Sequence, residues 1–112
     1  MEYTQYYKMT DTKQFVESDK QYAYEKLREM LVYTIIEKTL TSAGIYNDVT
    51  SEMKKKFNCN IYDCYKHPEY FSSILHTKYN DMYDLITESI GRQLEMFSHE
   101  KSIARFLQKM NS

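Results

Sequence analysis

Residues 27–40 read LREMLVYTIIEKTL. Two apolar series here repeat every four residues: Leu27, Leu31 and Ile35, and then Val32, Ile36 and Leu40. A four-residue repeat is typical of one face of an α-helix, and two such faces make a helix that is apolar most of the way round. We therefore predict a central helix over about residues 19–43, ended by Gly44 and covered by other helices or by a second subunit.

Three further helices are expected after it. Ile45, Val49, Met53 and Phe57 mark a helix over about residues 46–57, and Pro68 starts another that runs to about residue 79. After Asn80-Asp81, a longer apolar seam predicts a last helix, bent or broken in two near Gly91 or Ser98. Its members are Met82, Leu85, Ile86, Ile90, Leu94 and Phe97, followed by Ile103, Phe106 and Leu107.

The whole chain is expected to be all-α, a bundle of four or five helices without a sheet. Only two Gly and one Pro occur in 112 residues, which favours long helices with short connections. Residues 19–112 form the single predicted domain, and residues 1–18 a lead-in. Asp11 with Gln14, and Ser18 with Gln21, have capping-box spacing, so the lead-in is predicted to hold a short helix. Its tyrosines are expected to dock on another surface: Tyr3, Tyr6 and Tyr7.

Charge and composition exclude several classes of protein. Basic residues number 15 and acidic residues 16, and both halves of the chain are close to neutral. A general polyanion-binding surface is therefore not expected. No apolar run approaches the roughly 20 residues of a membrane span, and the first residues lack the pattern of a secretory signal. With two cysteines, too few for a disulfide scaffold, we expect a cytoplasmic protein.

The segment between the second and third helices holds the candidate reactive groups. Cys59, Cys64 and His67 are spaced C-x4-C-x2-H, but a zinc site needs four ligands and no fourth lies nearby. A Cys–His nucleophile pair needs an orienting third group, which the sequence does not supply. We predict that residues 58–67 form an irregular loop without metal, cofactor or catalysis, docked on the core by Cys59, Ile61 and Cys64. The structural loop motif comprises Cys59, Ile61, Asp63, Cys64, His67 and Pro68.

A DNA-binding alternative comes from the turn Ser42-Ala43-Gly44-Ile45 between two helices, which has the length of a helix-turn-helix connection. Lys54, Lys55 and Lys56 on the second helix would then contact phosphates. That helix carries no Arg or Gln to read bases, and a lysine run on a helix is usually a solvated face. Nucleic-acid binding is therefore the second hypothesis.

Residues 57–71, FNCNIYDCYKHPEYF, resemble the signature of a family of archaeal output domains, the Nitrosopumilus output domain of ammonia-oxidising archaea. The likeness covers about residues 25–95 and includes these positions: Ile74, Leu75, Tyr83, Ile86, Ser89 and Ile90. It departs at Lys78-Tyr79-Asn80, where an aromatic–Gly turn is expected. The resemblance implies a helical output module of two-component signalling, here standing without a receiver domain.

The sequence as a whole thus predicts a non-enzymatic signalling or regulatory module that acts through protein–protein contacts. The 12 Tyr residues support this, because Tyr buries a large area at an interface while keeping a polar tip. The apolar surplus of the central helix, or the seam of the last helix, predicts a homodimer.

Overall fold

The structure, a computed structural model, describes residues 9–111 and the side chains of residues 20–111. Within these residues the chain forms five α-helices and no strand, which confirms the all-α prediction. The helices are α1 (Met9–Ser42), α2 (Tyr46–Phe57), α3 (Pro68–Lys78), α4 (Tyr83–Gln93) and α5 (Lys101–Met110). Three short 3₁₀ helices connect them: η1 (Ile61–Cys64), η2 (Asn80–Met82) and η3 (Glu95–Phe97).

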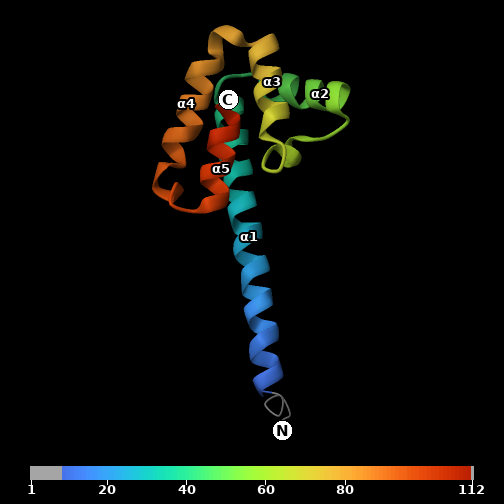
Figure 1. The fold of residues 1–112 in the computed structure, drawn as a ribbon. Helices are drawn as coiled ribbons and strands as arrows, with labels where there is room; N and C mark the ends of the chain where they lie inside the picture. Colours follow the sequence, from blue (N-terminus) through green and yellow to red (C-terminus); the bar gives the residue numbers. More distant parts are fainter. Residues whose placement is uncertain (1–8, 112) are drawn as a thin grey trace.

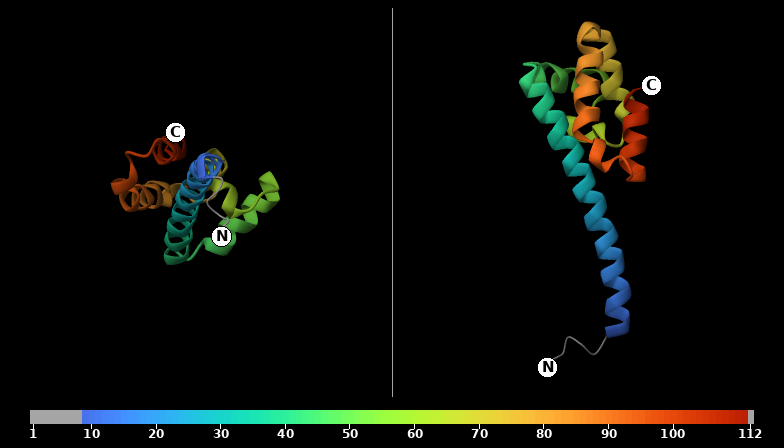
Figure 2. Two further views of the ribbon diagram at one scale, coloured as in Figure 1. Left: turned by 90° about the horizontal axis from the view of Figure 1, so that it is seen from below. Right: turned by 90° about the vertical axis from the view of Figure 1, so that its left-hand side faces the viewer.

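The helix α1 is much longer than the domain that it supports. It has 34 residues, and its N-terminal half projects away from the other helices, so that the molecule measures 62 × 29 × 22 Å (Figure 1 and Figure 2). The sequence predicted a short helix within residues 1–18 and a long helix from about residue 19. From Met9 onward the chain instead forms one uninterrupted helix. No Gly or Pro stands between Met9 and Ser42 to break it. The tyrosines at 3, 6 and 7 and the Asp11 and Ser18 side chains lie outside the described residues and side chains.

The end of α1 is formed as the sequence predicts. Gly44 adopts a φ of 76°, a conformation that costs glycine little. Its amide donates to the Thr41 carbonyl at 3.0 Å, and the Ile45 amide donates to the Leu40 carbonyl at 3.0 Å. These bonds satisfy carbonyl groups that the helix end would leave unpaired, and they turn the chain into α2.

The core lies between the C-terminal half of α1 and the helices α2 to α5. Its fully buried large side chains are Phe71, Phe106, Ile36, Leu40, Met53, Ile74, Leu75, Ile86, Ile90, Leu94, Ile103 and Met110. Two polar contacts tie distant segments across it. The Tyr83 hydroxyl donates to the Met110 carbonyl at 2.7 Å, and the Gln93 amide donates to the Thr39 hydroxyl at 3.0 Å. These bonds fix α4 against the end of α5 and against α1.

The last predicted segment forms two helices rather than one bent helix. Gly91 stays inside α4, whereas Ser98 falls in the connection between η3 and α5. Leu85 was placed in the buried seam, and this prediction was wrong, because 66% of its surface is exposed. Leu85 lies next to Ile86, at the edge of an open groove between α4 and the end of α1 that Lys38 and Ser42 also line.

Candidate protein-interaction surface

One side of α1 carries large apolar side chains that nothing in the described chain covers. Leu27 and Met30 expose 59% and 60% of their surface, and Ala23 and Thr34 are exposed with them. The spacing of these four residues, 4, 3 and 4, places them on one side of the helix, opposite the buried Val32 and Ile36. A 4–3–4 spacing is also that of a helix seam that packs against another helix. We call Ala23, Leu27, Met30 and Thr34 the outer face.

Beside the outer face, a shallow cleft of about 200 Å³ separates α1 from the start of α5. Its lining is mainly apolar and consists of Tyr24, Leu27, Arg28, Leu31, Phe97, Glu100 and Ile103. Tyr24 is exposed at its rim. The apolar surface therefore extends from α1 across the cleft to the start of α5. A groove between two helices can accept an apolar helix or loop of a partner.

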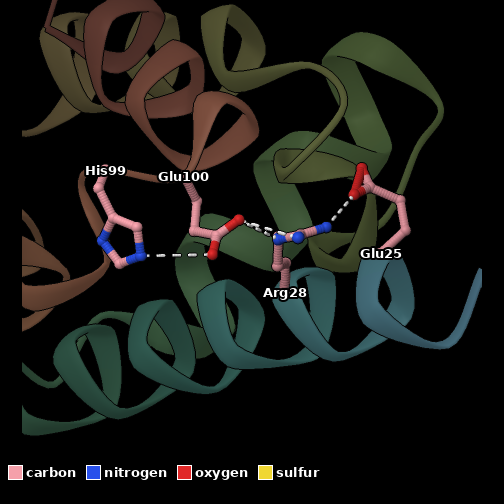
Figure 3. Close-up of polar contacts among 4 residues, drawn as sticks. All are labelled: Glu25, Arg28, His99 and Glu100. Carbon is pink, nitrogen blue, oxygen red and sulfur yellow. Dashed lines mark hydrogen bonds and ion pairs between the residues drawn. The ribbon is translucent and has the colours of Figure 1, made fainter. Parts of the chain in front are cut away.

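Arg28 holds the loop before α5 against α1 at the edge of this surface (Figure 3). Its Nε and Nη2 atoms both lie 2.8 Å from Glu100 Oε1, and Nη1 lies 2.8 Å from Glu25 Oε1. His99 Nε2 lies 3.4 Å from the other Glu100 oxygen. Burial acts to lower the pKa of Arg28, but the hydrogen bonds and charges of the two glutamates outweigh it and raise that pKa above its usual value. The guanidinium therefore stays charged and fixes the position of α5.

The predicted loop motif is more ordered than expected. The segment 58–67 was predicted to be irregular, but it contains η1, closed by a capping box. Asn60 Oδ1 accepts from the Tyr62 amide, and the Asn60 amide donates to Asp63 Oδ2, each at 3.0 Å. The N-x-x-D spacing of Asn60 and Asp63 was the signal for this box. Of the three side chains predicted to dock this segment, Ile61 and Cys64 are buried as expected, whereas Cys59 is only half-buried.

The cysteine chemistry of this loop is that of packed, protonated thiols. Burial raises the pKa of Cys64 strongly and that of Cys59 as well, so both thiols hold their protons more tightly and neither is a ready nucleophile. Cys64 Sγ instead contacts Met53 Sδ at 3.6 Å, and Cys59 is half-buried. Both cysteines are free thiols.

His67 and Pro68 belong to the start of α3. His67 Nδ1 lies 3.3 Å from Glu69 Oε2, and its ring stacks on Tyr70 with centroids 4.7 Å apart. Pro68 is buried at the first position of the helix. Among the described residues, no group of three or more His, Cys, Asp or Glu side chains is placed to hold a metal ion.

The lysine run of the DNA-binding alternative lies in the last turn of α2. Lys54, Lys55 and Lys56 are exposed. Glu52 lies beside them, with Oε2 at 3.8 Å from Lys55 Nζ and 3.1 Å from Lys78 Nζ. The hydrogen bond from Lys78 is the main cause that lowers the pKa of Glu52, which keeps this carboxylate charged next to the run. A negative charge there weakens attraction to phosphates.

The sequence did not reveal the Arg28–Glu100 contact. Glu25 and Arg28 are spaced i, i+3, a visible signal for a pair on one helix, but Glu100 is 72 residues away. The described helices include none that is long and apolar enough to cross a membrane. Comparisons with models of known protein families, with curated proteins and with solved structures gave no match.

Proposed function

We propose that this chain is a non-enzymatic signalling or regulatory module that acts through protein contacts and pairs with a second copy of itself through the outer face of α1. The observation that carries the proposal is the helix that continues beyond its own domain with Leu27 and Met30 uncovered. Adjacent apolar side chains of this size on one face are characteristic of interaction sites in water-soluble chains.

The outer face lies on a helix that continues past its own domain, so a partner helix can pack along it. A second copy is the occupant that needs no other gene product, and a two-fold axis lets one outer face cover the other.

The place of this module in a pathway is inferred from the loop motif. The resemblance of residues 57–71 to archaeal output domains supports a role as the output element of two-component signalling. The free thiols at Cys59 and Cys64 are compatible with a reducing compartment and support a cytoplasmic location. In this proposal the α2–α3 loop is structural, and the outer face carries the contacts.

The test compares two charge pairs that differ only in position. The variant Leu27→Glu/Met30→Glu places carboxylates on the outer face, and the control Leu85→Glu/Met96→Glu places them on other exposed apolar positions. Light scattering is measured on each protein from low to high micromolar concentration. We expect a dimer for the wild type and the control, and a monomer for the outer-face variant. A wild-type protein that stays monomeric would contradict the proposal. If only the Leu85→Glu/Met96→Glu control dissociates, the interface lies at α4 rather than at the outer face.

A further inference from the structure

A second cleft lies where α1, the segment after η1 and α5 meet, away from the outer face. It has two lobes of about 250 and 200 Å³ that share Glu25, Tyr65 and Lys66. The larger lobe is completed by Pro68, Ser102, Arg105, Phe106 and Lys109. The smaller lobe is completed by Tyr22, Lys26 and Glu29. Together they have the size of a site for a small organic ligand.

The larger lobe concentrates positive charge in a chain whose net charge is −1. Lys66, Arg105 and Lys109 are exposed around it, and none of them forms an ion pair with a described residue. The one carboxylate in this lobe, Glu25, is already bound by Arg28 at 2.8 Å. Lys109 also acts on Glu69, whose pKa is lowered by backbone and His67 hydrogen bonds and then by the charge of Lys109. Three cations around one concave site still attract an anion and raise its local concentration.

The same lobe contains two neighbouring hydroxyl groups, those of Tyr65 and Ser102. The Tyr65 hydroxyl is buried and forms no hydrogen bond of full geometry with a described residue. Burial raises the pKa of Tyr65, and a contact with the Ser102 side chain acts against this rise. A buried hydroxyl with only this incomplete contact can take a further partner. Charged donors and hydroxyls around one small space match the several acceptor oxygens of a phosphate group better than the two of a carboxylate.

The smaller lobe offers an aromatic surface. Tyr22 exposes 66% of its surface, and Lys26 Nζ lies 6.0 Å from the centroid of its ring. An exposed ring flanked by a cation stacks favourably with a planar nucleobase. Tyr22 lines the smaller lobe, and Glu25, Tyr65 and Lys66 line both lobes. This arrangement suits a ligand that carries a phosphate at one end and a base at the other.

We infer that this cleft binds a small phosphorylated ligand of the nucleoside monophosphate class. The phosphate lies in the lobe of Lys66, Arg105 and Lys109, and the base stacks on Tyr22. This goes beyond the proposed function, because no residue of the cleft belongs to the outer face, so binding and dimerisation are tested separately.

The experiment is calorimetric titration of the full chain with adenosine, guanosine, cytidine and uridine monophosphates, with inorganic phosphate, and with adenosine alone. The variant Arg105→Gln/Lys109→Gln removes two cations from the cleft. The matched control Arg92→Gln/Lys101→Gln removes one Arg and one Lys from outside it. All four positions are exposed, so the fold is expected to survive in both proteins.

We expect one saturable site for at least one nucleotide, weakened about tenfold or more in the cleft variant and less than about twofold in the control. Tyr65→Phe should also weaken binding while circular dichroism stays unchanged.

Absence of saturable binding to any phosphorylated probe overturns the inference. Equal losses in both double variants also overturn it, because attraction is then diffuse. If inorganic phosphate binds as tightly as the nucleotides, phosphate binding in the larger lobe is supported, but stacking of a base on Tyr22 is contradicted. Adenosine that binds as tightly as its monophosphate overturns the phosphate lobe.

Discussion

Two nitrogens of Arg28, Nε and Nη2, each lie 2.8 Å from the same oxygen of Glu100, although the two residues are 72 positions apart (Figure 3). The guanidinium and the carboxylate are both only partly exposed, so solvent screens them less than it screens a surface pair. The contact holds the N-terminal end of α5 at the point where α1 leaves the domain.

Replacing Glu100 by Gln is therefore expected to lower the midpoint of thermal unfolding, since it removes the charge that Arg28 faces. Glu95→Gln, at an exposed position without a described ion pair, is the matched control and should leave the midpoint nearly unchanged. The difference should shrink at about 1 M salt, where the screening length falls to about 3 Å. Scanning calorimetry of both variants at low and high salt measures this. Equal midpoints at low salt would show that the contact contributes nothing.

Two tyrosines allow a paired test of buried hydroxyl groups. Tyr83→Phe removes the donor to the Met110 carbonyl and should cost about 1–2 kcal/mol of unfolding free energy, because that carbonyl loses its side-chain partner. Tyr65→Phe removes a buried hydroxyl that forms no hydrogen bond of full geometry and has only a contact with Ser102, so it should cost less than Tyr83→Phe. Urea unfolding of both variants checks the pair. A larger loss for Tyr65→Phe than for Tyr83→Phe would contradict the assignment.

Alkaline pH should destabilise the fold through Cys64. Burial, and then the charges of Cys59 and Asp63, raise the pKa of this thiol in the folded state. The folded chain thus holds the proton more tightly than the unfolded chain does. The stabilisation is complete below the ordinary thiol pKa of about 8.5 and is lost as pH rises above it, by up to about 1.4 kcal/mol per pH unit. Tyr79, whose pKa burial and Asp48 raise to about 12, adds a loss at higher pH.

The measurement is the unfolding free energy in urea between about pH 7 and pH 10, for the wild type and for Cys64→Ala. The substitution lowers stability at every pH because it leaves a cavity, so the slope against pH is the informative quantity. We expect a shallower slope for Cys64→Ala. Parallel curves for the two proteins would exclude Cys64 as the titrating group.

Specific DNA binding is not expected from the lysine run. With Glu52 beside Lys55, triple substitution of Lys54, Lys55 and Lys56 by Gln should leave duplex binding weak and unchanged at physiological salt. Fluorescence anisotropy with random and genomic duplexes measures this from low to physiological salt. Nanomolar binding of one duplex, abolished by the triple substitution, would establish the helix-turn-helix alternative instead.

The sequence predicted helices well and surfaces poorly, for physical reasons. Four-residue repeats such as Ile45, Val49 and Met53 locate a helix because local geometry sets their period. A repeat does not say from which side neighbours arrive. Leu85 and Leu27 both belong to apolar stripes, yet each is exposed because the other helices approach from another side. The Arg28–Glu100 contact and the two-lobed cleft likewise depend on how α5 folds back on α1.

The length of α1 has a mechanical consequence. At 1.5 Å per residue, its 34 residues span about 51 Å, of which about 28 Å lies before Arg28. A tilt of about 10° at the domain would move the far end by about 5 Å, roughly one helical pitch. The cleft residues Tyr22 and Glu25 alternate along this rod with the outer-face residues Ala23 and Leu27. A ligand bound in the cleft would therefore contact the same helix that carries the outer face. A small tilt of α1 on binding would shift the register of a second subunit packed along that face.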